Sequence, residues 1–186
     1  TQMIDNRELL ESQYDVVAGE WPDEFNEVVI VADKNNQITD FALYALGIRN
    51  SSELKDLLIN MDSSNTLYDE ATSYTYEDLL DLKFKLVLPS SYYQYDEMNK
   101  AYKDMSSSDS YVKKLIDNGI EIKVSGIIVA SKDAVATSIM GTIAYTSDLV
   151  DYVINETLKQ DIVKNQLNNP TVDVFSSLPF VSEQLK

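Results

Sequence analysis

Carboxylates are the side chains in this sequence that could do acid–base chemistry, because histidine and cysteine are both absent. Two carboxylates with different pKa values can divide the roles of general acid and general base. Each adjacent acidic pair lies in a polar stretch, however, where no apolar surroundings would raise a pKa. A chain with 31 acidic residues also contains such pairs by chance. We therefore expect no catalysis by the pairs Asp23-Glu24, Asp69-Glu70, Glu77-Asp78 and Asp96-Glu97.

The missing histidine and cysteine exclude several other kinds of site. Ser-His-Asp and Cys-His catalysis, His-ligated metals, iron–sulfur clusters and disulfides all need one of these residues. The Ser-x-x-Lys pairs Ser52/Lys55 and Ser110/Lys113 lack the Ser-Asp-Asn and Lys-Thr-Gly sequences that accompany that pattern in enzymes. The run 33–40 begins like a calcium-binding loop, but Ile38 stands where glycine is needed and Tyr44 where glutamate is needed. We expect no enzyme activity, no metal and no cofactor.

Composition limits the partners of this chain. The 186 residues are 44% hydrophobic and 25% charged, which is typical of a globular protein. Lys and Arg total 15 against 31 Asp and Glu, for a net charge of −16. So acidic a chain is a poor ligand for nucleic acid or for an anionic membrane surface. No stretch reaches the ~18 apolar residues of a membrane span, and the start at Thr1 leads us to expect an excised segment of a longer protein.

Tyrosine is the most informative residue type in this sequence, with 12 copies. Four of them, Tyr92, Tyr93, Tyr95 and Tyr102, surround the polar run 96–100, which predicts an exposed hairpin. Tyrosine offers a large, rigid contact area with a polar tip, so this group could form a partner-binding surface. Alternatively, the alternate tyrosines pack across the hairpin on one another. Trp21, just before a proline, is interpreted as an anchor on the sheet rather than a sugar-stacking platform.

The spacing of apolar residues predicts interspersed strands and helices. Strands are expected over 27–32, 82–88 and 120–130, with a bend at Gly126 and a further strand within 134–146. Helices are expected within 4–14, over 41–46 and 50–60, from the cap at 106–109 to 117, and as one long helix over about 148–168. This pattern predicts an α+β fold: a mixed, largely antiparallel sheet with helices packed on it and an exposed hairpin insertion. We expect a single domain over 1–186, decorated at 62–78 and 90–118.

The order of these segments resembles a known family. A Gly19-Glu-Trp-Pro22 turn is followed by the strand Glu27-Val-Val29 and then by Asp33, as in the large extracellular domains of Gram-positive ABC transporter permeases of the MacB/FtsX type. The helical run 40–47, the strands 80–88 and 119–128, and the exit segments 165–175 and 178–180 are similar to the segments that follow in that family. The resemblance covers about residues 14–180 and rests on pattern and order.

The resemblance implies a function without chemistry of its own. The chain would be a non-catalytic domain outside the cell, part of an integral membrane permease that pairs with a cytoplasmic ABC ATPase and forms a dimer. It would contact a peptide substrate or an extracellular partner and help to couple ATP-driven conformational change across the membrane. The alternative is a secreted or surface-anchored binding module that uses the surface formed by Tyr92, Tyr93, Tyr95 and Tyr102.

Overall fold

The computed structural model describes residues 1–33, 38, 43 and 74–180. The chain forms two compact units. The first contains Thr1–Leu82 and Lys123–Ser147, and the second contains Lys83–Ile122 and Asp148–Lys186. Because each unit is built from two separate stretches of chain, neither can be cut out as one continuous piece. The expectation of a single domain over 1–186 stays a prediction, and the helices expected over 41–46 and 50–60 lie, apart from Leu43, outside the described residues.

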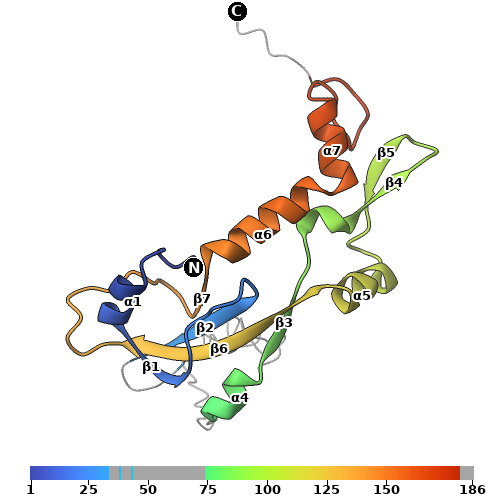
Figure 1. Cartoon of the computed structure of the whole chain (residues 1–186). Coiled ribbons are helices and arrows are strands. Elements are labelled where there is room, and N and C mark those ends of the chain that lie inside the picture. The colour runs from blue at the N-terminus through green and yellow to red at the C-terminus, as the bar shows by residue number, and fades with distance from the viewer. Residues whose placement is uncertain (34–37, 39–42, 44–73, 181–186) are drawn as a thin grey trace, which may run out of the picture. The chain divides into compact units, whose positions relative to one another are not determined.

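Figure 1 shows the helices and strands of both units. The described elements of the first unit are α1 (Arg7–Gln13), β1 (Tyr14–Gly19), β2 (Glu27–Ala32), α4 (Tyr76–Leu80), most of β6 (Ile120–Ala130) and β7 (Ile143–Tyr145). Those of the second unit are β3 (Lys83–Leu86), the 3-10 helix η1 (Pro89–Tyr92), β4 (Tyr93–Asp96), β5 (Ala101–Asp104), α5 (Asp109–Asp117), α6 (Ser147–Leu158) from its second residue on, and α7 (Asp161–Asn168). The predicted α+β class is confirmed, with a mixed and mostly antiparallel sheet.

The sheet has five strands, of which β1, β6, β2 and β7 lie side by side in that order. β6 runs antiparallel to β1 and parallel to β2, and β2 runs antiparallel to β7. The first residues of β6 belong to the second unit, and β3 also pairs with this strand. The strands predicted over 27–32 and 120–130 are confirmed, and the one predicted over 82–88 is confirmed at its centre, 83–86.

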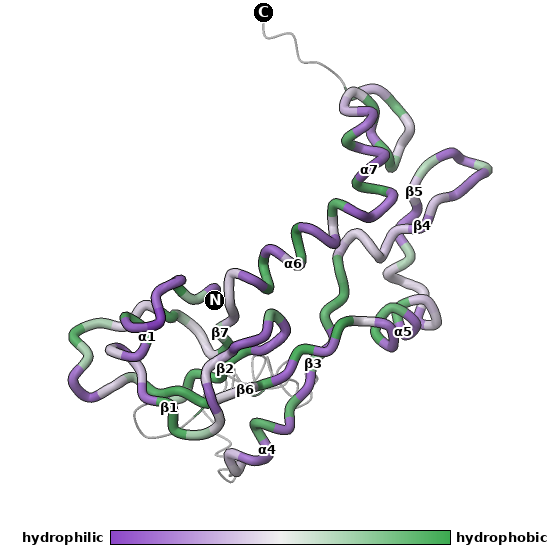
Figure 2. The backbone as a smooth tube through the Cα atoms, viewed as in Figure 1, coloured by the Kyte–Doolittle hydropathy of each residue, from purple (hydrophilic) through white to green (hydrophobic). Residues whose placement is uncertain are grey.

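The core of the first unit lies on β2 and β6 because these central strands are rich in β-branched residues. Val29, Ile30, Ile127 and Ile128 are fully buried. Side chains alternate across a strand, so Val29 and Ile128 face one side of the sheet and Ile30 and Ile127 the other. Figure 2 shows the hydrophobic residues along β1 and the adjoining part of β6. Burial on both faces explains why these strands read as continuous apolar runs.

The bend predicted at Gly126 is confirmed as a register shift in β6. Val28 pairs with Val124 and the next residue, Val29, pairs with Gly126, so Ser125 is the extra residue of a bulge. The carbonyl oxygen of Ser125 accepts the N–H of Glu20 at 2.9 Å. The bulge therefore ties β6 to the turn that follows β1.

The expectation of one long helix over 148–168 is wrong, because the chain forms two helices there. α6 ends at Leu158 and α7 begins at Asp161, with Gln160 in an extended conformation (φ −70°, ψ 138°) between them. The N–H groups of Lys159 and Gln160 bond to carbonyls only three residues back, at 3.2 and 3.1 Å. These tight turns close α6, while the apolar spacing continues through the break and conceals it from a periodicity analysis.

Two further segments differ from expectation. The end of the predicted decoration 62–78 forms the start of α4. There the Thr75 hydroxyl accepts the N–H of Asp78, and the Asp78 carboxylate accepts the N–H of Thr75. This capping box stabilises a helix too short for periodicity to reveal. The strand expected within 134–146 is reduced to β7, because the N–H of Ile139 bonds to the Tyr14 hydroxyl at 2.7 Å instead of to a neighbouring strand.

Candidate functional site

The hairpin of β4 and β5 is confirmed, and a carboxylate builds its turn. One oxygen of Asp96 accepts the N–H of Met98 at 2.9 Å, and the other accepts the side-chain N–H of Asn99 at 2.7 Å. These bonds, led by the one from the Asn99 side chain, lower the pKa of Asp96 below its ordinary value. Asp96 therefore stays ionised at neutral pH, and the loop between the strands is held by side-chain bonds of its own.

The four tyrosines expected at a partner surface have different environments. Tyr95 and Tyr102 are directly opposite each other in the register, and their rings meet edge to face with centroids 5.2 Å apart. Tyr102 is only 9% exposed, whereas Tyr95 is 42% exposed. Tyr92 and Tyr93 are partly buried. The alternative that tyrosines pack across the hairpin thus holds for this pair, and Tyr95 is the member of the group whose side chain is most open to a partner.

The segment that follows α7 completes this aromatic cluster. The N–H of Tyr102 donates to the carbonyl of Val174 at 2.9 Å, on the side of β5 away from β4. The Phe175 ring lies 4.9 Å from the Tyr93 ring and is 49% exposed. Sequence reasoning missed Phe175, because the stretch 165–175 was considered only as an exit segment of the resemblance. The clustering of Phe175, Leu178 and Phe180 in a short polar segment is the pattern that could have drawn attention to it.

Tyr102 is a buried titratable group of the cluster. Burial raises the pKa of its hydroxyl, and a hydrogen bond from the Asn165 side chain at 2.6 Å opposes part of that rise. The neutral phenol at this position therefore accepts a bond from α7. The contact links β5 to α7, which lie side by side in Figure 1.

The acidic pairs that lie among the described residues form turns and caps. The N–H groups of Asp23 and Glu24 both donate to one carboxylate oxygen of Glu27, at 3.0 and 3.1 Å. Bonds from Thr75, chiefly from its hydroxyl, lower the pKa of Asp78. A carboxyl group with a lowered pKa is a poor general acid at neutral pH, so Asp78 and Asp96 are unsuited to that role. The pair Asp69-Glu70 lies outside the described residues.

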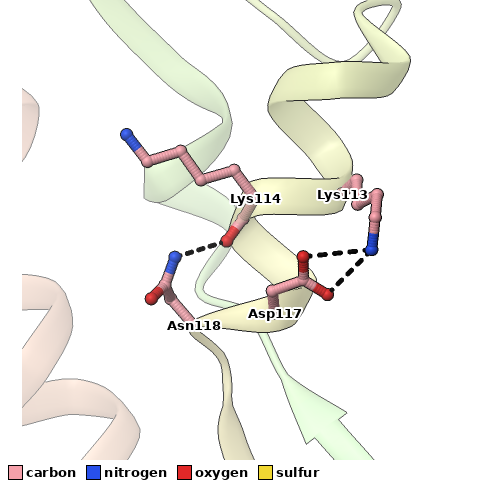
Figure 3. A network of polar contacts seen from close by, with 4 residues as sticks. All are labelled: Lys113, Lys114, Asp117 and Asn118. Atoms are coloured by element: carbon pink, nitrogen blue, oxygen red, sulfur yellow. Dashed lines mark hydrogen bonds and ion pairs between the residues drawn. The ribbon is translucent and has the colours of Figure 1, made fainter.

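The second Ser-x-x-Lys sequence, Ser110/Lys113, lies in the first half of an ordinary helix, α5. Lys113 forms an ion pair with Asp117 at 3.1 Å, and the side-chain amide of Asn118 donates to the carbonyl of Lys114 at 2.7 Å (Figure 3). The hydroxyl of Ser110 lies 3.4 Å from that of Ser108. These contacts close α5 rather than pair a nucleophile with a base. Ser52 and Lys55 lie outside the described residues, as does most of the run 33–40.

Trp21 is an anchor, as expected. Its side chain is buried in a cluster with Met3, Leu10, Tyr14 and Val29, and the guanidinium of Arg7 lies 5.2 Å from the centre of its ring. A buried indole is not a platform for a sugar. The residue holds the turn after β1 against the sheet.

The second unit also has a hollow of about 200 Å³ with mainly apolar walls. It is lined by Leu86, Val87, Leu88, Ser91, Leu115, Asn118, Gly119, Ile120, Tyr152 and Glu156. The Glu156 carboxylate at this hollow forms an ion pair with Lys159. Its size and lining suit an apolar side chain rather than an acid–base reaction.

Within the described ranges, no group of three acidic residues is arranged to hold a metal ion. Nor does any described helix have both the length and the apolar character needed to cross a bilayer. Comparisons of this chain with protein-family models, curated proteins and solved structures find no match.

Proposed function

We propose that this chain is the extracellular domain of a MacB/FtsX-type ABC transporter permease. In this role it contacts a peptide substrate or an extracellular partner and couples conformational change to a cytoplasmic ATPase. It carries out no chemistry itself. The full permease, as a dimer, would be the working form.

The observation that carries the proposal is that the segments behind the resemblance meet in one place. Gly19, which begins the Gly-x-Trp-Pro turn, pairs with Gly126 of β6. Trp21 of the same turn packs in the core with Val29 of the Glu-Val-Val strand. Residues about 100 positions apart thus depend on one another, which supports reading the pattern as a fold signature rather than as a chance sequence.

The hairpin supports the contact role. Aromatic residues are favoured at interfaces because they bury a large area at a low cost in conformational entropy. Here Tyr95 and Phe175 are both substantially exposed, and Met98 at the turn is 94% exposed. These side chains belong to the second unit, and they offer a partner a surface stiffened by the contacts of Tyr102.

The proposal is tested by fractionating source cells with an antibody to this domain. The expected result is a large integral membrane polypeptide whose epitope is destroyed when protease is added to intact protoplasts. A cytoplasmic marker protein that survives the same treatment is the control. An epitope that resists external protease, or that is released without detergent, would overturn the proposal.

A second candidate function is a secreted or surface-anchored binding module. The exposure of Tyr95, Met98 and Phe175 favours it equally, because a contact surface needs no permease. The same experiment separates the two functions. A soluble species no larger than this chain in the medium or at the cell wall would favour the binding module.

A further inference from the structure

The backbone of β4 has an open edge, and the bonding of β5 reveals it. In an antiparallel pair, residues opposite each other exchange both backbone hydrogen bonds or neither. The N–H of Tyr102 donates to Val174, on the far side of β5. Tyr102 therefore exchanges no bonds with Tyr95 across the ladder, and both backbone groups of Tyr95 point away from β5.

The neighbouring bonds agree with this alternation. The N–H of Met105 donates to the carbonyl of Tyr92, so every second residue of β4 turns its backbone outward, including Tyr93. The N–H of Tyr93 is taken by the carbonyl of Ser90. Across the described part of the chain, no residue bonds to the N–H or C=O of Tyr95 or to the C=O of Tyr93. One donor and two acceptors are therefore presented at the edge.

Charge is divided unequally between the two strands of the hairpin. Asp96 ends β4 and Glu97 follows it, whereas β5 contains Lys103 and Asp104, and Lys100 lies just before β5. β4 has one acid and no basic residue, whereas Lys103 and Asp104 offset each other in β5, so the open edge is on the more acidic strand. The aromatic rings add to this preference, because the faces of Tyr93 and Tyr95 attract cations.

We propose that the outer edge of β4 binds an extended, basic segment of a partner polypeptide by strand addition. Backbone groups of that segment bond to Tyr93 and Tyr95, and its Lys or Arg side chains lie toward Asp96, Glu97 and the tyrosine rings. A second copy of this chain is a worse occupant, because its own β4 is acidic and each chain carries a net charge of −16. The inference rests on the hairpin and is independent of the permease proposal.

The short length of β4 has a consequence for strength. Three backbone groups and two carboxylates make a weak site, so we expect fast exchange and an affinity in the micromolar to millimolar range. A short edge is also less prone to pair with a second copy. Binding of this kind suits a partner that is engaged and released repeatedly.

The experiment is a titration of the whole 186-residue chain, labelled with ¹⁵N, with two synthetic peptides of equal length. One alternates Lys with Val and the other alternates Glu with Val. The basic peptide is expected to shift the hairpin amides and to slow hydrogen exchange at the Tyr95 N–H. Equal binding of the acidic peptide, or shifts that avoid the hairpin, would overturn the proposal, as would concentration-dependent self-association through this edge.

Two sets of variants test the edge itself. Tyr95→Pro removes the outward N–H without touching a ladder bond, and we expect affinity to fall at least about tenfold. Tyr95→Val keeps the N–H and is the matched control, with a loss of about threefold or less expected from the missing ring. Similar losses from both variants would contradict strand addition.

Charge is tested separately, so that a disturbed hairpin cannot decide the result. Asp96→Asn with Glu97→Gln keeps an acceptor for the turn, and we expect about a threefold to tenfold loss of affinity at low salt. Asp148→Asn with Asp151→Asn, which removes two exposed acids on α6, is the control for net charge and should leave binding nearly unchanged. If this control weakens binding as much as the hairpin variant, attraction to the whole acidic chain explains it and the site is refuted.

Discussion

Gly19 and Gly126 are paired across β1 and β6. Each lacks room for a side chain because of the carbonyl group of the residue next to its partner. A Cβ on Gly19 would lie 2.2 Å from the carbonyl oxygen of Ser125, and a Cβ on Gly126 would lie 2.2 Å from that of Glu20. Both obstacles are backbone atoms, which cannot rotate away. The two glycines therefore allow the turn after β1 to sit directly on the bulge of β6.

This pairing predicts an order of stability among alanine variants. Gly19→Ala should be the most destabilising, because Gly19 also has a positive φ of 67°, and Gly126→Ala should cost about 2–4 kcal/mol through its clash alone. Gly141→Ala is the control, with a positive φ of 101° but its nearest neighbour 3.6 Å away, and it should cost about 1–2 kcal/mol. Urea unfolding measures all three variants, and a Gly126→Ala protein as stable as the wild type would refute the contact.

The capping box of α4 predicts that Thr75→Ala lowers the free energy of unfolding by about 1 kcal/mol. Thr75→Ser keeps the hydroxyl and should retain most of the stability. The pKa of Asp78 is lowered in the folded state, so its contribution is present above the ordinary value of 3.8 and is lost as pH falls through the lower folded value. The difference between wild type and Thr75→Ala should shrink in acid, and a difference that grows would contradict the box.

The hydrogen bond between Tyr102 and Asn165 predicts that their contributions to the free energy of unfolding are coupled. Tyr102→Phe and Asn165→Ala each remove the hydrogen bond of 2.6 Å between these residues, and each should cost about 1 kcal/mol. In the double variant, the second change should cost less than it does alone, as a double-mutant cycle followed by urea unfolding would show. Strictly additive losses would mean that the bond contributes nothing to stability.

The burial of Tyr102 also predicts a shifted alkaline titration. Because burial raises the pKa of Tyr102, its hydroxyl should ionise above the ordinary value of 10. Its stabilising contribution is complete below that value and is lost as pH rises through the folded pKa. The ultraviolet difference between wild type and Tyr102→Phe, recorded against pH, isolates this one group. A difference spectrum that titrates below the ordinary value would contradict the burial.

The ion pairs beside β6 predict a small effect. Glu121 lies 3.3 Å from the ammonium of Lys83 and 3.7 Å from that of Lys85, and all three side chains are exposed. Glu121→Gln should therefore cost less than about 1 kcal/mol, and high salt should remove most of the difference. Urea unfolding at low and high salt makes the comparison. A large loss that survives in salt would indicate that Glu121 does more than pair with these lysines.

Local periodicity predicted much of the fold. A continuous β-branched run identified the strand at 27–32, and alternation that continues into such a run identified the strand at 120–130. The polar run 96–100 between tyrosines identified the hairpin, because turn residues act within a few positions. Periodicity failed where a local backbone bond decides the outcome, as at Gln160 between α6 and α7. It also failed at α4, which is shorter than two helical turns.

The candidate site was predicted only in part for the same reason. The sequence by itself determined that His- and Cys-based chemistry is absent and that tyrosines gather at one hairpin. Only the tertiary structure decided that Tyr102 is buried, that Tyr95 is exposed and that β4 keeps an open edge. These outcomes depend on Val174 and Asn165, which lie more than 60 residues from Tyr102 in the chain. Residue types and spacing carry local preferences, whereas burial and free backbone groups follow from which distant segments meet.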